Sequence, residues 1–117
     1  LLEQCAFAHL HVFPFSPRPG TAAADMKNQV PERISGQRTS ILRALSASNY
    51  KKYVTGWHNR EVDVLIEEKA GKNWIGISEN YLKSEVCDIL NNDTGVCRAI
   101  VESVDSAGIK CRFLDWI

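Results

Sequence analysis

Residues 61–68 read Glu-Val-Asp-Val-Leu-Ile-Glu-Glu, a stretch in which apolar and acidic side chains alternate. Successive side chains of a β-strand point to opposite faces, so Val62, Val64 and Ile66 share one face and most of the acids share the other. This alternation predicts a strand from Arg60 onward, with one face in a core and the other in water.

Turn signals divide the rest of the sequence into four more short segments. Residues 68–72 turn the chain, and the loops 91–95 and 105–108 are rich in Asn, Asp, Ser and Gly. The expected strands are one that starts at Trp74 and runs towards Tyr81, followed by residues 83–88, 96–104 and 109–114. Five short strands separated by turns predict a small antiparallel barrel over residues 58–117.

The last predicted hairpin assigns its side chains to two faces. One face carries apolar residues, namely Cys97, Ala99, Val101, Ile109, Cys111 and Phe113. Arg98, Lys110 and Arg112 then lie on the outer face of two neighbouring strands. Glu102 lies opposite Lys110 or Arg112, depending on the register of the hairpin, and in either case it partly neutralises one of these cations.

A helical segment precedes the predicted barrel, in residues 28–57. Pro31 followed by Glu32 is typical of a helix start. Ile34, Ile41, Leu42 and Leu45 follow at helical spacing, which predicts an amphipathic helix of about four turns. We expect a break at residues 46–49, after which residues 50–57 form a second short helix or a docked tail.

The first part of the chain, residues 1–27, contains a different kind of strand signal. Residues 5–15 are aromatic and β-branched on both faces, as in a strand of a buried parallel sheet, and the run ends at Ser-Pro-Arg-Pro-Gly in residues 16–20. The chain supplies no obvious neighbours for such a strand. We therefore expect residues 1–27 to be disordered, to pack on the barrel, or to pair with another copy through the open strand edge.

Composition and charge exclude several classes of protein. With 44% hydrophobic and 24% charged residues, the chain is neither wholly disordered nor collagen-like. The 14 basic and 14 acidic residues cancel overall. Residues 1–57 carry a net charge of +4 (7 − 3) and residues 58–117 a net charge of −4 (7 − 11), so anion binding by the second half requires a local patch. No apolar run is long enough for a membrane span, and we expect a soluble protein of the cytoplasm with no membrane partner.

The four cysteines do not form a recognisable metal motif. Cys5, Cys87, Cys97 and Cys111 include no CxxC pair, so we expect no metal site. Without an export signal, the expected state of these residues is a reduced thiol, and in the strands a small core residue.

The N-terminal motif resembles one enzyme family. His-Val-Phe-Pro-Phe-Ser-Pro-Arg-Pro-Gly-Thr-Ala-Ala (residues 11–23), followed by Asn-Gln-Val-Pro-Glu (residues 28–32), is similar to the tRNA methylthiotransferases, which are radical S-adenosylmethionine (SAM) enzymes. Residues 61–68, 71–82 and 85–86 are similar to the first three strands of the TRAM domain that ends these enzymes. The resemblance covers nearly the whole chain, and the ending of the first motif favours the branch that acts on threonylcarbamoyladenosine.

The resemblance implies a division of the chain and a reaction. Residues 1–27 would be the last strand and loop of the radical SAM barrel, residues 28–57 a connecting helix, and residues 58–117 a five-stranded OB-like TRAM barrel. The parent enzyme would add a methylthio group to C2 of N6-threonylcarbamoyladenosine, using SAM and two 4Fe–4S clusters. This chain lacks the CxxxCxxC cluster ligands, so we expect it to bind none of these cofactors, to contain no catalytic residue and to be inactive by itself.

The implied partners are the tRNA anticodon stem-loop and the radical SAM and N-terminal domains of the same protein. The candidate RNA-binding residues combine aromatic rings with cations: Trp74, Tyr81, Lys72, Lys83, Arg98, Lys110 and Arg112. Five of these have a structural alternative, since Trp74 and Tyr81 could serve the core and the three cations of the last hairpin could form a solvated face. Ser16, Arg18 and Thr21 are candidates for contact with substrate or SAM in the parent, or for tying their own turn.

Three other functions compete with this interpretation. A freestanding OB-like nucleic-acid-binding module explains the barrel but leaves residues 11–23 unexplained. A purely structural barrel would pack on the catalytic domain and hardly touch RNA. The third alternative is the same family acting on N6-isopentenyladenosine.

Overall fold

The computed structural model describes residues 1–90 and 94–117, and these form two compact units, Leu1–Tyr50 and Lys51–Ile117. The boundary between the units lies within a long helix. Part of the loop predicted at residues 91–95 lies outside the described residues. In the described part of the chain, no helix is both long and apolar enough to cross a membrane.

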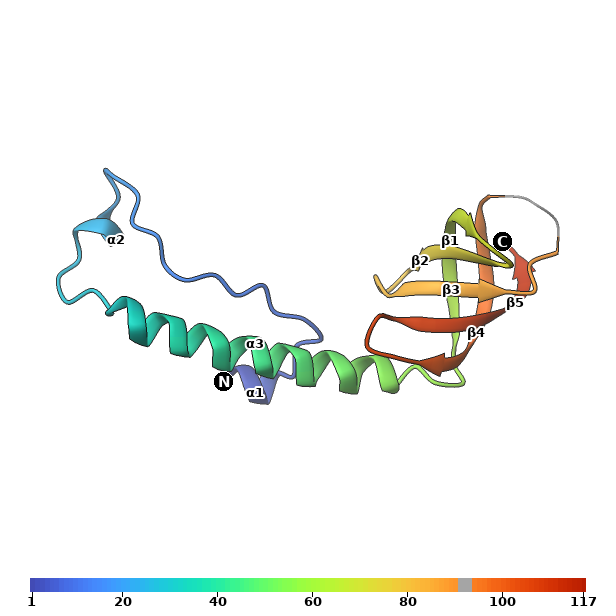
Figure 1. Ribbon diagram of the computed structural model, residues 1–117, viewed down its shortest axis with the longest axis horizontal. Coiled ribbons are helices and arrows are strands. Elements are labelled where there is room, and N and C mark those ends of the chain that lie inside the picture. Colours follow the sequence, from blue (N-terminus) through green and yellow to red (C-terminus); the bar gives the residue numbers. More distant parts are fainter. Residues whose placement is uncertain (91–93) are drawn as a thin grey trace. The chain divides into compact units, whose positions relative to one another are not determined.

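The second unit contains five strands that close into a barrel (Figure 1), which confirms the predicted architecture. The strands are β1 (Glu61–Ala70), β2 (Asn73–Ser78), β3 (Lys83–Cys87), β4 (Val96–Val104) and β5 (Ile109–Trp116). Their order around the barrel is β1-β2-β3-β5-β4, and β1 pairs with β4 to close it. This is the strand arrangement of an OB-like barrel.

One pair of strands differs from the predicted antiparallel arrangement, because β3 and β5 run parallel. The other four pairs are antiparallel. Strand directions cannot alternate all the way around a closed ring with an odd number of members, so at least one pair must be parallel. The barrel is therefore mixed.

The apolar side chains that alternate along the strands fill the interior of the barrel, as the sequence predicted. The inner side chains of β1 and of the β4–β5 hairpin are buried, and Phe113 is half-buried. The apolar core consists of Val54, Val62, Val64, Ile66, Trp74, Leu82, Val86, Cys97, Ala99, Val101, Ile109 and Cys111. Cys97 and Cys111 point inward, as predicted, and the outer faces are left to the charged residues.

The helical region is one continuous helix, α3 (Glu32–Thr55), so the predicted break at residues 46–49 is wrong. Ser46 is buried, and its hydroxyl accepts a hydrogen bond from the backbone N–H of Leu10 at 2.9 Å. A serine hydroxyl can compete with helical hydrogen bonds, but here a distant segment occupies it and the helix continues.

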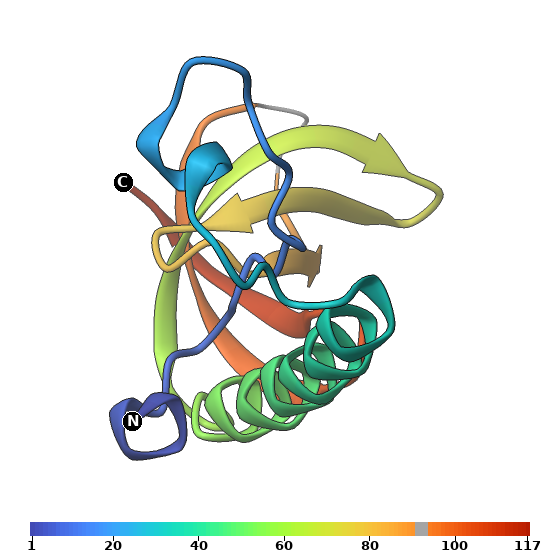
Figure 2. The same ribbon diagram turned by 90° about the vertical axis from the view of Figure 1, so that its left-hand side faces the viewer.

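The first 27 residues, all of which the structure describes, form no strand, so the strand predicted at residues 5–15 is wrong (Figure 2). They contain only two four-residue helices, α1 (Leu2–Cys5) and α2 (Ala22–Asp25), joined by an extended segment. A strand needs a hydrogen-bonding neighbour, and this segment has none. Phe13 and Phe15 are accordingly exposed. Self-association through this segment stays a prediction, and it would require the extended chain to pair.

Candidate nucleic-acid interface

The three cations predicted on the last hairpin are exposed on the outside of β4 and β5, and each meets a carboxylate. Asp63 lies directly across from Arg98, and its two oxygens accept from Nε at 2.9 Å and from Nη2 at 3.3 Å. The other two pairs are Arg112 Nε with Glu102 Oε1 at 2.7 Å and Lys110 Nζ with Glu85 Oε2 at 3.9 Å.

These pairs neutralise the surface of β4 and β5. The Asp63 carboxylate raises the pKa of Arg98, and the Glu102 carboxylate raises the pKa of Arg112. A phosphate that approached this face would meet a cation already paired with an acid, and displacing the acid would leave a negative charge beside it. The face therefore offers little net attraction to an anion.

A bulge in β4 decides between the two registers considered for Glu102. Val101 pairs with Cys111 and Ser103 pairs with Lys110, so Glu102 is an extra residue with no partner on β5. Its carboxylate reaches Arg112 instead. The sequence left both Lys110 and Arg112 as possible partners of Glu102. A bulge shifts the register of the hairpin but leaves the alternation of side chains within each flanking segment intact, so the sequence pattern does not reveal it.

The outer face of β2 and β3 differs from that of β4 and β5, because its predicted lysines are not neutralised by an acid among the described residues. Lys72 precedes β2 and Lys83 begins β3, opposite Ile77. Within residues 1–90 and 94–117, neither lysine forms an ion pair. In OB-folds, oligonucleotides bind on the face of strands 2 and 3 and against the β1–β2 and β4–β5 loops. We define the β2–β3 surface as Lys72, Ile75, Ile77, Tyr81 and Lys83.

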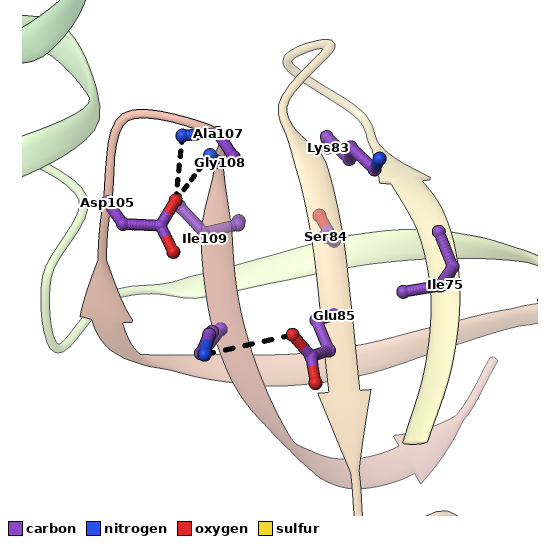
Figure 3. Close-up of a pocket in the computed structure, with 9 residues that line it drawn as sticks. Ile75, Lys83, Ser84, Glu85, Asp105, Ala107, Gly108 and Ile109 are labelled. Atoms are coloured by element: carbon purple, nitrogen blue, oxygen red, sulfur yellow. Dashed lines mark hydrogen bonds and ion pairs between the residues drawn. The ribbon is translucent and has the colours of Figure 1, made fainter. Parts of the chain in front are cut away.

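A shallow pocket of about 190 Å³ lies on this surface, between β3 and the β4–β5 loop (Figure 3). Ile75, Lys83 and Lys110 are among its lining residues. Glu85, which also lines the pocket, is held by Lys110 and by the side-chain amide of Asn73 at 2.5 Å. The lining thus combines two isoleucines with two lysines and two acids, and one of these acids, Glu85, is paired with Lys110.

Asp105 shapes the wall of this pocket that the β4–β5 loop provides. Its Oδ1 accepts hydrogen bonds from the backbone N–H groups of Ala107 at 2.7 Å and Gly108 at 3.0 Å (Figure 3). A Cβ atom at Gly108 would lie 2.1 Å from the carbonyl oxygen of Lys83. The loop therefore approaches β3 more closely than a larger residue would permit.

The structure separates the two predicted aromatic candidates. Trp74 is only 7% exposed and belongs to the core, with the Lys69 ammonium 5.4 Å from its ring centroid. Because the ring is buried, no base can stack on it in this conformation, and the core alternative applies. Tyr81, in contrast, is 89% exposed in the β2–β3 loop.

Ser16, Arg18 and Thr21 lie in the first unit, in the turn before α2, and all three are exposed. The Thr21 hydroxyl donates to the Arg18 carbonyl at 2.8 Å and accepts from the Ala24 N–H at 3.3 Å, so it ties the turn and caps α2. The backbone of Arg18, rather than its guanidinium, takes part in this turn. Contact of these residues with substrate or SAM stays a prediction.

Two of the four cysteines, Cys97 and Cys111, are buried thiols of the barrel core. Burial raises the pKa of the Cys111 thiol to about 12 and also raises that of Cys97. Iron–sulfur clusters are held by thiolates, whereas these core thiols stay protonated. Among the described residues, no three His, Cys, Asp or Glu side chains gather as ligands of one metal ion. The residues present therefore do not fit an iron–sulfur cluster.

Raising the pH above 9 should destabilise the barrel through Cys111. The thiol titrates near pH 9 when unperturbed but near pH 12 in the folded protein, so between these values the unfolded chain loses a proton that the folded chain keeps. The free energy of unfolding should then fall by about 1.4 kcal/mol per pH unit, and this contribution is complete only below pH 9. Urea unfolding across this range should show a shallower slope for Cys111→Ala and an unchanged slope for Cys5→Ala; equal slopes for wild type and Cys111→Ala would contradict the prediction.

The fold is thus an OB-like barrel whose β2–β3 surface carries two lysines that form no ion pair within residues 1–90 and 94–117, a shallow pocket and an exposed tyrosine. No family model matches the chain. It is 39% identical over 82 residues to the threonylcarbamoyladenosine tRNA methylthiotransferase MtaB of Treponema pallidum, which covers 70% of this chain and 16% of that protein. It is 34% identical over 118 residues to MtaB of Thermotoga maritima, covering 96% and 26% of the two chains. It is also 42% identical over 67 residues to the ribosomal protein uS12 methylthiotransferase RimO of a Synechococcus species, covering 57% and 15%.

The chain therefore belongs to the methylthiotransferase family and corresponds to a segment of these enzymes. It spans about a quarter or less of the length of the relatives it matches.

Proposed function

We propose that this chain is the C-terminal, tRNA-binding part of a radical SAM methylthiotransferase that modifies C2 of N6-threonylcarbamoyladenosine beside the tRNA anticodon. The observation that carries the proposal is the match of nearly the whole chain to MtaB of Thermotoga maritima. Relatives from Treponema pallidum and Bacillus subtilis carry the same name. The parent enzyme would act in the cytoplasm, where tRNA is modified.

The barrel would act as a TRAM domain that holds the anticodon stem-loop. Lys83 lies opposite Ile77 of β2, and Ile77 is five residues after Lys72. At the rise of a β-strand, this places Lys72 and Lys83 roughly 17 Å apart along β2. An OB-fold accommodates about 4–16 nucleotides, so one RNA strand could contact both lysines. Residues 58–117 contain eleven acidic and seven basic residues, so we expect binding by this chain alone to be weak and salt-sensitive.

The rest of the parent protein would supply the reaction chemistry. In this proposal two 4Fe–4S clusters and SAM would supply the radical chemistry of methylthiolation, and they would be bound outside this chain, whose Cys97 and Cys111 are buried thiols of the barrel core. Residues 1–27 would belong to the end of the catalytic barrel. The 117-residue chain should therefore bind RNA but not modify it.

A second substrate is favoured by another set of relatives. The chain is 30% identical over 118 residues, 97% of its length, to the tRNA-2-methylthio-N(6)-dimethylallyladenosine synthase of Wolbachia pipientis wMel. The alternative parent reaction would therefore be methylthiolation of N6-dimethylallyladenosine, the isopentenyl-modified nucleoside.

Mass spectrometry of tRNA nucleosides tests the parent reaction. Cells without the complete gene should lose the 2-methylthio derivative of N6-threonylcarbamoyladenosine and accumulate its precursor, and the complete gene should restore the product. The gene portion that encodes only these 117 residues should not restore it. Loss of 2-methylthio-N6-dimethylallyladenosine instead would favour the second substrate, and unchanged tRNA with unmodified uS12 would reject both.

A further inference from the structure

The β2–β3 loop exposes a large aromatic side chain between two anchored residues. Tyr81 is 89% exposed, whereas the next residue, Leu82, is 1% exposed and lies in the core. Asn80, on the other side, is half-buried. The chain thus turns outward for one residue and then returns to the interior.

This turn is built from the backbone and one serine, without the tyrosine ring. The Tyr81 N–H donates to the Ser78 carbonyl at 2.8 Å, and the Ser78 N–H donates to the Leu82 carbonyl at 3.0 Å. The buried Ser78 hydroxyl accepts from the Leu82 N–H at 3.0 Å and donates to Asn80 Oδ1 at 2.5 Å. The loop therefore holds its shape whether or not residue 81 has a large side chain.

The backbone of Tyr81 is in a conformation that favours glycine. Its φ angle is +62°, in the left-handed region, where a Cβ atom is strained. Glycine would relieve this strain, and a polar residue would suit the exposure better. A tyrosine here therefore gains nothing from burial and is strained by its backbone, so neither core packing nor local geometry accounts for this side chain.

One cation, Lys83, lies close to Tyr81 in the sequence. Lys83 is two residues along the chain, so its Cα is within roughly 7 Å of that of Tyr81. Lys83 also lines the pocket on the β2–β3 surface. An exposed ring beside a lysine provides the two contacts made to an unpaired nucleotide, namely stacking on the base and attraction of its phosphate.

We propose that Tyr81 is the platform on which one unpaired base of the bound RNA stacks, with Ser78 and Leu82 holding the loop in shape and Lys83 contacting the adjoining phosphate. This inference rests on the proposed RNA-binding function and names the kind of nucleotide recognised. Stacking on Tyr81 requires an RNA base that is not paired, so the barrel recognises an RNA loop and not a fully paired RNA helix. It also assigns stacking to Tyr81 rather than to the buried Trp74.

Replacing Tyr81 with glycine tests the inference because stability and binding should change in opposite directions. Removing the strained Cβ should leave the melting temperature of the 117-residue chain unchanged or higher. Affinity for an anticodon stem-loop RNA, measured by fluorescence anisotropy, should fall about 5- to 150-fold, the range expected for one stacked base. Tyr81→Phe keeps the ring and should retain wild-type affinity. Wild type should bind the stem-loop more tightly than a duplex of the same length.

The outcomes separate the inference from the proposal on which it rests. If wild type binds the stem-loop and Tyr81→Gly binds it equally well, Tyr81 is not a stacking platform, whatever the barrel binds elsewhere. Equal affinity of wild type for the stem-loop and the duplex would also overturn the inference. If wild type binds neither RNA, the proposed RNA-binding function fails, and the inference fails with it.

Discussion

Replacing Gly76 with alanine should destabilise the barrel by about 3 kcal/mol or more, a large part of the stability of a domain of this size. Gly76 lies in β2, where a Cβ atom would be 2.1 Å from the carbonyl oxygen of Leu65 and 3.0 Å from Cγ1 of Val64. The first of these neighbours is backbone of the paired strand β1, so it cannot move aside without breaking the β1–β2 pairing. Chemical unfolding followed by the fluorescence of the buried Trp74 would measure the loss.

Gly71 provides the matched control for this substitution. It lies in the β1–β2 turn with a φ angle of +65°, and a Cβ atom there would meet nothing within 4 Å. Gly71→Ala should therefore cost about 1–2 kcal/mol from backbone strain alone. Equal stabilities of Gly76→Ala and wild type would show that β1 and β2 do not approach each other as closely as described.

Removing Lys72 and Lys83 together should weaken RNA binding far more than removing Arg98 and Arg112 together. Lys72 and Lys83 form no ion pair within the described residues, so an RNA phosphate can replace their counterions. Loss of two phosphate contacts on a single RNA strand should make the slope of log K against log salt concentration shallower by about 1.4. If the electrostatic contribution vanishes near 1 M salt, this corresponds to about 25-fold weaker binding at 0.1 M salt.

The arginine pair is a charge-matched control on the same barrel. Arg98 and Arg112 already bind Asp63 and Glu102, so they are not available for direct contact with a phosphate, while their removal changes the net charge by the same amount as removal of the two lysines. Anisotropy titrations of the two double variants at several salt concentrations compare the surfaces directly. A greater loss of affinity and of salt dependence for Arg98→Ala/Arg112→Ala would assign the interface to β4 and β5 instead.

The strands were predictable because turn signals separate them and because β1 and the β4–β5 hairpin contain a two-residue period that matches the barrel's inner and outer faces. The inward cysteines of β4 and β5 follow from the same alternation. The parallel β3–β5 pair did not follow from it, because alternation within a strand carries no information about the direction of its neighbour. That pair results from ring closure with five strands.

The errors at the N-terminal end have a different cause. Residues 5–15 have the composition of a buried strand, but a strand forms only where another strand pairs with it, and among the described residues no strand pairs with this segment. Ser46 has the propensity to interrupt a helix, yet its hydroxyl bonds to Leu10, which lies 36 residues away in the sequence. Local patterns could not predict either outcome, since each depends on a distant segment.

The candidate site was predicted in part. Tyr81, Lys72 and Lys83 are exposed on the β2–β3 surface, whereas Trp74 is in the core. The neutralisation of Arg98 by Asp63 was not visible in the sequence, because the two residues are 35 positions apart and become neighbours only through the β1–β4 pairing that closes the barrel. Pairing across the closure therefore decides which cations remain available to a ligand.

Nuclear magnetic resonance mapping of the RNA-binding surface on the 117-residue chain tests the central claim most directly. As an anticodon stem-loop RNA is added, the largest shifts in backbone amide signals should occur in residues 72–85 and 105–110, which form the β2–β3 surface and the wall of its pocket. The amides around Arg98 should change little. Shifts centred on β1 and β4, or no shifts at any RNA concentration, would contradict the account.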